Sequence, residues 1–220
     1  MKYLENKLFK LYNGQGFFSR LHIKIRYLRG RLWELEKFIP KDGKILDLGC
    51  GHGVFANLLA ITSDKRDILG VDISQSKIDT AKTTIGKRMN INFKACDITS
   101  LDLHDEFDAV TVMDVFYLIP FSLQKLILEK IYKLLKNDGV LVINEVCREK
   151  SLRFLMALLQ ENISVRIIKI TKGNDFDFRT SAEWSSLIED AGFTVTRFKR
   201  KTFNPATLFI CRKQGDSGKQ

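Results

Sequence analysis

The chain has 220 residues, of which 45% are hydrophobic, and it carries a formal net charge of +10 at pH 7. This length is enough for one domain with a substantial core. No apolar run reaches the ~18–20 residues of a membrane span, and the charged first ten residues do not form a secretory signal peptide. The four cysteines are scattered without a C-x-x-C pair, and the three histidines lack metal-ligand spacing. The sequence therefore predicts a reduced, cytoplasmic protein without a metal site.

The positive charge is concentrated at the two ends of the chain. Residues 1–38 contain nine Lys and Arg against three Asp and Glu, and residues 193–220 contain seven against one. Residues 39–192, by contrast, contain twenty against twenty-two. Basic ends around a near-neutral core favour an acidic partner: an anionic membrane surface, an acidic carrier protein or, with less support, a nucleic acid. The alternative is that these charges only keep the protein in solution.

An amphipathic helix is predicted over residues 15–38. Six apolar residues recur at alternating spacings of three and four, which places them on one face, and five basic residues lie between them. Such a helix either lies on a membrane or an acidic protein, or caps its own domain with the apolar stripe facing inward. The stripe comprises Phe18, Leu21, Ile25, Leu28, Leu32 and Leu35, and the basic residues are Arg20, Lys24, Arg26, Arg29 and Arg31.

A glycine-rich turn follows the first predicted strand, residues 44–48. The run ILDLGCGHG over residues 45–53 has glycines at alternate positions, and an apolar helical pattern begins directly after it. Alternate glycines allow a tight turn and a close approach by a ligand, while the helix N-terminus presents free N–H groups. Asp47 precedes the first glycine by two residues. A carboxylate at this position suits an amino-bearing ligand better than the pyrophosphate of a dinucleotide.

Four more strands are predicted, and helical patterns separate them. Alternating strands and helices predict a parallel sheet with helices on both faces. Aspartates end or follow three of the strands, and Asp72 lies 23 residues beyond Gly49, near the spacing at which an acid meets ribose hydroxyls. The run KNDG at 136–139 predicts a turn before the last strand. The strands are residues 67–71, 91–96, 107–113 and 140–146, and the helices are residues 54–62, 74–86 and 122–135.

The C-terminal part is predicted to contain a capped helix and two antiparallel strands. Thr180 and Glu183 form a capping-box pattern that opens a helix, and Gly192 ends it. Residues 193–200 and 207–212 follow as a hairpin. Residues 148–179, between the last parallel strand and this helix, form an apolar insertion that is long for a loop.

In this order, the signals over about residues 41–212 resemble the class I S-adenosylmethionine (SAM)-dependent methyltransferases. The resemblance implies a seven-stranded, mostly parallel, doubly wound α/β sheet with an antiparallel C-terminal hairpin. It also implies SAM as cofactor, S-adenosylhomocysteine as product, and a substrate lid built from the insertion. Residues 1–38 would be a basic helical cap, residues 39–214 the SAM-binding domain, and residues 215–220 a disordered tail. The cofactor-binding residues implied are Asp47, Gly49, Cys50, Gly51, Gly53, Asp72, Ile73, Asp97, Ile98, Met113 and Asp114.

Three residues near the ends of strands four and five are candidates for catalysis: Asp114, Tyr117 and Glu145. A phenol or alcohol acceptor can require a general base, whereas an acidic acceptor does not. Related enzymes often have histidine where this chain has Tyr117, and tyrosine is a much weaker base at neutral pH. This difference argues against O-methylation that relies on a histidine at that position, although His22 or His104 could take the role instead.

A second resemblance concerns the substrate. The basic amphipathic start, the pattern D-V-x-x-x-x-P at 114–120 and the long insertion resemble small methyltransferases of lipid and polyene assembly. This resemblance implies a hydrophobic, lipid-like or polyketide-like small molecule, presented by an acidic carrier protein or at a membrane periphery. The alternatives are a methyltransferase for another metabolite or for RNA, and a non-catalytic SAM-binding partner subunit.

Overall fold

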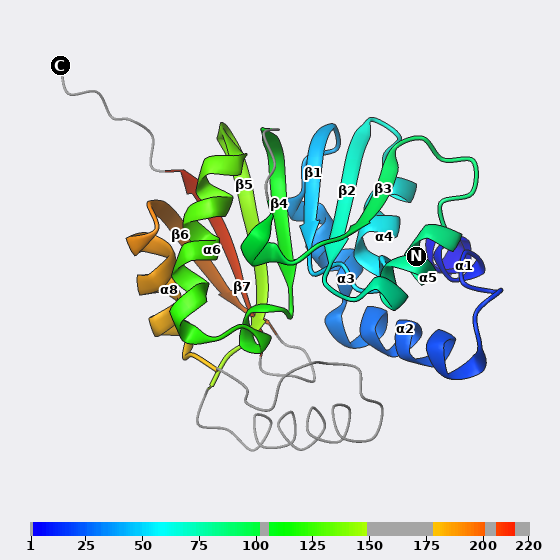
Figure 1. Cartoon of the computed structure of the whole chain (residues 1–220), viewed down its shortest axis with the longest axis horizontal. Helices are drawn as coiled ribbons and strands as arrows, with labels where there is room; N and C mark the ends of the chain where they lie inside the picture. The colour runs from blue at the N-terminus through cyan, green and yellow to red at the C-terminus, as the bar shows by residue number, and fades with distance from the viewer. Residues whose placement is uncertain (1, 102–105, 149–177, 201–205, 214–220) are drawn as a thin grey trace.

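A seven-stranded sheet forms the centre of the computed structural model, which describes residues 2–101, 106–148, 178–200 and 206–213 (Figure 1). The strands are β1 Gly43–Leu48, β2 Arg66–Asp72, β3 Ile91–Ala95, β4 Phe107–Met113, β5 Leu135–Val146, β6 Phe193–Lys199 and β7 Ala206–Lys213. Their order is β3-β2-β1-β4-β5-β7-β6. The strands β1 to β5 pair in parallel, and β7 pairs antiparallel with both β5 and β6. The predicted fold class and the antiparallel C-terminal hairpin are confirmed.

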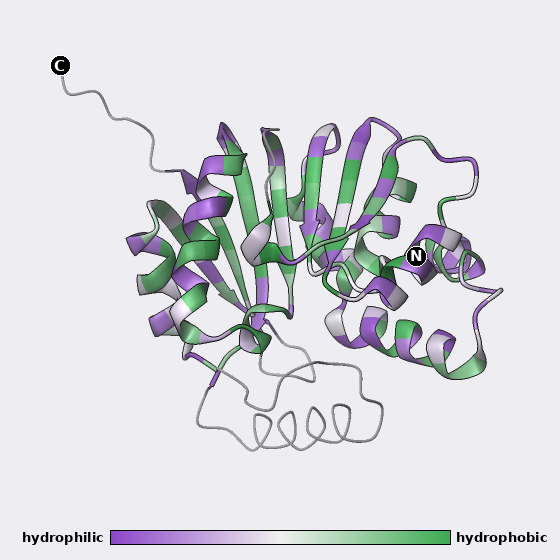
Figure 2. Ribbon diagram, in the orientation of Figure 1, coloured by the Kyte–Doolittle hydropathy of each residue, from purple (hydrophilic) through white to green (hydrophobic). Residues whose placement is uncertain are grey.

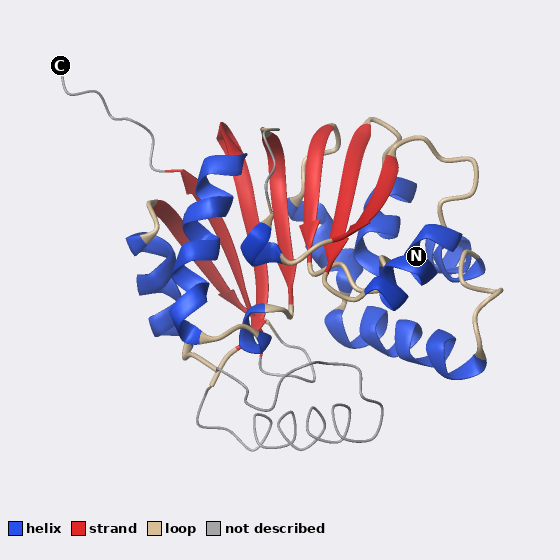
Figure 3. Cartoon of the chain, in the orientation of Figure 1, coloured by secondary structure: helices blue, strands red, loops and turns tan. Residues whose placement is uncertain are grey.

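Helices cover both faces of the sheet (Figure 3). Side chains alternate along a strand, and Ile45 packs in the core that includes α4, whereas Leu46 and Leu48 pack in the core that includes α6 and α8. The β1 strand is therefore apolar on both sides, as expected for a buried parallel strand. The helices that cover the two faces are α4 Val54–Thr62, α5 Gln75–Thr83, α6 Phe121–Leu134 and α8 Ser181–Asp190.

The capping box at the start of α8 is confirmed. The amide of Glu183 donates to Thr180 Oγ1 at 3.2 Å, and the amide of Thr180 donates to Glu183 Oε2 at 2.7 Å. Trp184 follows in the first turn, fully buried, with its ring 5.0 Å from that of Phe116. The helix therefore begins at the predicted residue and is fixed to the sheet within one turn.

The predicted turn before β5 is wrong. The strand begins at Leu135, directly after α6, and pairs with β4 on both sides of an irregularity. Phe107 pairs with Leu135, but Ala109 pairs with Val140, so extra residues of β5 bulge out of the ladder. A Cβ at Gly139 would lie only 3.0 Å from the carbonyl oxygen of Phe107. The run KNDG therefore forms a bulge inside a longer strand.

The N-terminal cap also differs from the prediction. One helix over residues 15–38 was expected, but the chain turns at Arg31, whose φ of 44° is left-handed. The face of α2 that packs on the domain contains Ile23 and Tyr27, whereas Phe18, Leu21, Ile25 and Leu28 are 41–84% exposed. The inward-facing stripe is therefore wrong for these four residues and holds only for Leu32 and Leu35. The elements of the cap are α1 Lys2–Lys10, α2 Phe17–Gly30, α3 Leu32–Leu35 and the 3-10 helix η1 Glu36–Phe38.

The buried face of α2 is determined by aromatic contacts within the cap. The ring of Tyr27 lies 5.2 Å from the rings of both Phe9 and Trp33, which come from α1 and α3. Within the described residues, no helix is long and apolar enough to cross a bilayer. The predicted lid lies almost entirely outside the described residues, as does the predicted tail at 215–220.

Candidate active site

The candidate site lies at the carboxyl edge of the parallel strands. The order of the strands reverses between β1 and β4, and ligands bind α/β sheets at such a switch point. The α2 helix lies along this edge, at the lower right in Figure 1. Its Arg26 donates from Nη2 to the carbonyl oxygen of Met113, at the end of β4, with a distance of 2.8 Å. The basic cap and the end of β4 therefore meet at this edge.

The three glycines of the turn after β1 all have positive φ, between 56° and 75°. A Cβ at Gly49 would lie 2.4 Å from Val115 Cγ2, and one at Gly53 would lie 2.6 Å from Phe93 Cζ. These two glycines therefore permit close packing inside the protein. A Cβ at Gly51 would meet no atom within 4 Å. The middle glycine faces open space, where a ligand can approach the backbone.

Residues from other elements hold the turn in place. Tyr12 donates its hydroxyl to the carbonyl oxygen of His52 at 2.9 Å. Asn57 Nδ2 is 2.9 Å from the Tyr12 hydroxyl and 2.8 Å from the carbonyl oxygen of Gly53. The amide of Cys50 donates to the carbonyl oxygen of Val71 at 2.9 Å, and the Cys50 thiol is buried. The Cys50 side chain is therefore part of the packing behind the turn, and its role toward the cofactor stays a prediction.

One carboxylate oxygen of Asp47 is buried and has no hydrogen bond of good geometry among the described residues. The side chain is 1% exposed, and Oδ1 accepts from Thr111 Oγ1 at 2.7 Å. Among the described residues, Oδ2 has no hydrogen-bond partner. Burial raises the pKa of Asp47 to about 6, although the Thr111 hydrogen bond, the charge of Arg26 and the nearby backbone amide of Ala56 oppose this rise. Because an unsatisfied buried carboxylate is costly, this oxygen fits the amino group of a ligand.

Asp72, at the end of β2, is already oriented. Its Oδ2 accepts from the amide of Gly51 at 2.8 Å, and its Oδ1 accepts from the amide of Ser74 at 2.9 Å. An ionised carboxylate has about four acceptor sites, so about two remain for ribose hydroxyls. The next residue, Ile73, is 67% exposed, which leaves an apolar side chain available to pack against a flat base.

Two of the implied cofactor-binding residues, Asp97 and Ile98, lie beyond β3. Asp97 is exposed, and its Oδ1 accepts from the amide and the hydroxyl of Thr99, each at 2.8 Å. The carboxylate thus caps the short 3-10 helix η2 Ile98–Ser100, in which Ile98 is half-buried. A role of Asp97 and Ile98 toward adenine stays a prediction.

Arg26 is a candidate site residue that the sequence reasoning missed. It is close enough to Asp47 and Asp114 to lower the pKa of each carboxyl, although burial has the larger effect and raises both. A guanidinium beside buried acids can bind the carboxylate of an amino-acid ligand while the acids bind its amino group. The sequence counted Arg26 only among the basic residues of the cap. No spacing signal connects it with the glycine turn, since contact arises only in the folded chain.

Two histidines also meet at this edge. The rings of His22, on α2, and His52, in the turn, lie 5.7 Å apart. Burial, together with the charges of Arg26 and Lys77, lowers the pKa of both imidazoles, and that of His52 falls to about 4. Both side chains are therefore neutral at pH 7.

Asp114 has a strained backbone. Its φ of 57° is left-handed, which is uncommon for a residue other than glycine and is often retained at functional sites. Asn144 holds it twice: Asp114 N donates to the Asn144 carbonyl oxygen, and Asn144 Nδ2 donates to Asp114 Oδ1, both at 2.8 Å. Arg200 Nη1 donates to Asn144 Oδ1 at 3.0 Å, which orients the amide. The carboxylate of Asp114 is therefore held by Asn144 on β5, which is in turn oriented by Arg200, the residue after β6.

Glu145 and Tyr117 have different positions. Glu145 is 0% exposed, and its carboxylate accepts from the amides of Phe116 at 2.9 Å and Val146 at 3.1 Å. Burial and the charge of Asp114 raise its pKa well above the ordinary value. The bond from Phe116 holds the start of the 3-10 helix η3 Phe116–Leu118, so the carboxylate has a structural role there, and a catalytic role of Glu145 stays a prediction. The Tyr117 ring stacks on that of Phe178, with centroids 5.1 Å apart.

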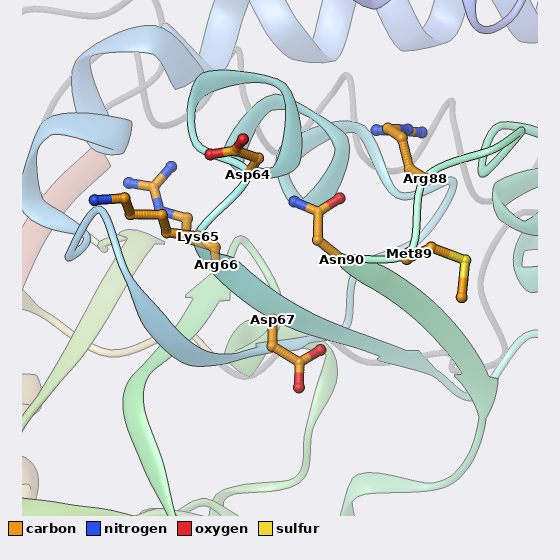
Figure 4. A pocket seen from close by; sticks show the side chains of 7 residues that line it. All are labelled: Asp64, Lys65, Arg66, Asp67, Arg88, Met89 and Asn90. Atoms are coloured by element: carbon orange, nitrogen blue, oxygen red, sulfur yellow. The ribbon is translucent and has the colours of Figure 1, made fainter.

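A hollow at the opposite edge of the sheet is a separate feature (Figure 4). It has a volume of about 530 Å³ and lies at the amino ends of β2 and β3. Its buried Arg66 already donates to Glu36, to Thr62 and to several backbone carbonyls. The lining residues are Asp64, Lys65, Arg66, Asp67, Arg88, Met89 and Asn90.

Curated relatives match parts of the chain. An uncharacterised protein of Rickettsia prowazekii is 36% identical over 58% of this chain and 53% of its own length. The carboxy-S-adenosyl-L-methionine synthase of Nautilia profundicola is 32% identical over 56% of this chain and 53% of its own length. The chain thus spans about half the length of these two relatives. The ubiquinone biosynthesis O-methyltransferase of Haemophilus ducreyi is 26% identical over 74% of this chain and 70% of its own length.

A solved structure and a family model match the chain over the region that contains the candidate site. The crystal structure of the apo form of SibL, an S-adenosylmethionine-dependent methyltransferase, superposes with a TM-score of 0.72, 18% identity, and coverage of 89% of this chain and 57% of that one. The family model of the methyltransferase domain matches residues 39–192, from the residue before Pro40 to the glycine that ends α8. The chain belongs to the methyltransferase domain family.

Proposed function

We propose that this protein transfers a methyl group from SAM to a hydrophobic small molecule. The observation that carries the proposal is the unsatisfied Asp47 oxygen beside a glycine turn whose middle residue, Gly51, faces open space. The amino group, backbone approach and ribose contacts that SAM requires all have counterparts here. When bound, SAM supplies a methyl group already activated by its sulfonium.

The residues of the chain would hold the cofactor at both ends. Asp47 would accept from the amino group, and Arg26 would donate to the carboxylate. Asp72 would accept from the ribose hydroxyls, and Ile73 would pack against the base. Holding two reactants in line supplies roughly 7–11 kcal/mol in the best model reactions, so positioning is the main contribution expected of the protein.

A hydroxyl acceptor would also need a proton acceptor. A neutral imidazole has a free lone pair, and we assign this role to His22, which lies on α2 at the edge of the site beside His52. The lowered pKa of His22 keeps it unprotonated at neutral pH but also makes it a moderate base. Asp114 and Tyr117 remain the candidates for orienting the acceptor.

A hydrophobic substrate has two supports. Tyr117 packs with Phe178 and Val146 in an apolar cluster three residues beyond Asp114. One relative is named a ubiquinone biosynthesis O-methyltransferase, an enzyme of a lipid-soluble ring compound. We therefore propose a lipid-like acceptor, either free or bound to an acidic carrier protein.

The first experiment tests for the cofactor cradle. Calorimetry with SAM, S-adenosylhomocysteine and methylthioadenosine, which lacks the amino-acid end, should be compared for wild type and Arg26→Ala. The substitution should weaken the first two ligands about tenfold, as expected for a hydrogen bond to a charged group. It should leave methylthioadenosine unchanged. Equal losses of affinity for all three ligands would show that Arg26 does not bind the carboxylate of the cofactor.

The second experiment tests for transfer. Formation of S-adenosylhomocysteine should be measured with a hydroxylated ring compound that carries an isoprenoid chain, and with the same ring without the chain. Faster turnover of the chain-bearing compound is expected. SAM binding without turnover of any acceptor would favour a non-catalytic SAM-binding subunit, and a carboxylated cofactor in the mass spectrum would favour the activity named for the Nautilia relative.

A further inference from the structure

The α2 helix has an exposed apolar stripe that no described part of the chain covers. Its outward side chains are 41–84% exposed, whereas Ile23 and Tyr27 on the opposite side are buried. In Figure 2, apolar and polar residues alternate along this helix. The exposed apolar residues are Phe17, Phe18, Leu21, Ile25 and Leu28.

These residues form one continuous stripe. At about 100° of rotation per residue, the five side chains fall within an arc of about 100°. Lys24 and Arg20, both exposed, lie along one border of the arc. Arg29 lies near the other border. The helix contains four Lys and Arg and no Asp or Glu.

We propose that α2 docks in the plane of an anionic lipid surface through this apolar stripe. An aromatic and aliphatic stripe between basic borders matches a helix that lies at the interface between headgroups and acyl chains. The lack of acidic residues on α2 matches anionic headgroups, which attract Lys and Arg by about 1 kcal/mol per charge, or about fivefold in affinity. A second copy of the chain would bring like charges together, and this makes the lipid surface the better occupant.

Docking would place the active site at the surface. Arg26 on the inner side of α2 donates to Met113, and His22 lies beside His52. The same helix would therefore contact lipid on one side and the site on the other. This part of the inference rests on the proposed function, since it assigns the source of a lipid-soluble acceptor.

Flotation of the full-length protein with vesicles tests the inference. Wild type should bind phosphatidylcholine vesicles that contain phosphatidylglycerol, bind pure phosphatidylcholine vesicles weakly, and lose binding as salt increases. Phe17→Ser with Phe18→Ser, and separately Arg20→Glu with Lys24→Glu, should each reduce the bound fraction at least about tenfold. Absence of wild-type binding at low salt would overturn the inference.

Matched controls separate α2 from general surface properties. Met89→Ser removes a side chain that is 96% exposed at the opposite edge of the sheet, and Lys65→Glu with Lys87→Glu gives the same change in charge there. These variants should keep wild-type flotation, and equal losses in both sets would overturn the assignment to α2. Size-exclusion chromatography should show no shift in mass with the Phe17 and Phe18 changes; a dimer that these changes dissociate would assign the stripe to a second copy.

SAM calorimetry and turnover of a short-chain, water-dispersed acceptor give an independent readout. Normal values with no flotation would reject lipid docking and leave the proposed function standing. Normal flotation without SAM binding would reject the proposed function and leave lipid docking standing.

Discussion

Both edges of the parallel sheet contain buried charged side chains, but the two edges differ in how many of the hydrogen bonds of these side chains are made. At the amino edge, Arg66 is fully enclosed, and its donors are used by Glu36, Thr62 and backbone carbonyls. Burial alone would raise the pKa of Glu36, but hydrogen bonds from Lys41, Thr62 and Arg66 hold it below its ordinary value. At the carboxyl edge, Asp47 has one oxygen without a partner among the described residues and a pKa raised to about 6.

This difference separates architecture from function. A buried charge whose bonds are complete stabilises the fold and has nothing left for a ligand. A buried charge with an unmet bond makes the apo protein less stable and gains a partner when the ligand arrives. The hollow at the amino edge is therefore less informative about function than the carboxyl edge.

The largest expected effect is on stability at the amino edge. Arg66→Met removes the buried partner of the Glu36 carboxylate and should lower the free energy of unfolding by about 3–5 kcal/mol. Urea unfolding measures this change, with Lys65→Met as the exposed neighbouring control. SAM affinity of the folded variant should stay at the wild-type value. A large loss of affinity would mean that the two edges are not independent.

Asp72 should have the next largest effect, at the carboxyl edge. Asp72→Ala removes acceptors for the ribose hydroxyls and should weaken SAM binding tenfold to a hundredfold, since bonds to a charged group contribute roughly 1.5–3 kcal/mol. Calorimetry measures the affinity. Unfolding should also become easier, because the amides of Gly51 and Ser74 lose their acceptor. Unchanged SAM affinity would remove Asp72 from the cofactor site.

Substitution of Asp47, unlike that of Asp72, should raise the free energy of unfolding of the apo protein. Because the folded-state Asp47 pKa of about 6 exceeds the ordinary 3.8, the folded protein retains a proton that the unfolded chain releases between pH about 4 and about 6. Stability of the apo protein therefore falls as the pH rises through this window. Asp47→Asn should remove this fall and stabilise the apo protein by about 1–3 kcal/mol at pH 7, while it weakens SAM binding. Urea unfolding at both ends of the window, with and without SAM, measures both effects; a less stable variant at pH 7 would contradict the argument.

Tyr117→Phe should have the smallest effect. The ring stack on Phe178 is preserved, and only the hydroxyl is lost. Turnover should fall up to about tenfold, the lower part of the range for groups in acid–base roles, with SAM affinity unchanged. Weaker SAM binding with normal turnover at saturation would assign Tyr117 to the cofactor.

Local signals in the sequence were sufficient for the sheet and the glycine turn. Glycine spacing, the aspartates that end or follow strands and the capping box act over a few residues, and the structure confirms each at or near its predicted position. The positions of Arg26 and His22 depend on how α2 crosses the sheet, which no local pattern encodes. The inward-facing alternative for the α2 stripe failed for a related reason. Two apolar rows compete on this helix, and contacts of Tyr27 with Phe9 and Trp33 determine which row is buried.

Glu145 illustrates a different limit. A glutamate in an apolar strand attracts a catalytic interpretation, but its carboxylate is used by two backbone amides. Sequence gives the residue type and the strand, whereas the number of bonds already made is a property of the folded backbone. Burial and bond completeness, rather than residue type, distinguish Glu145 from Asp47.

The hydroxyl of Tyr12 has a consequence for binding that extends beyond the site. Burial raises the pKa of this phenol, so it remains a donor to the carbonyl oxygen of His52 at any ordinary pH. The glycine turn is thereby connected to a residue that follows α1, 40 positions earlier in the chain. A ligand that orders the turn must also strengthen the docking of the N-terminal segment, and by thermodynamic reciprocity that docking raises ligand affinity by the same factor. The first helix of the chain is thus coupled to the cofactor without touching it.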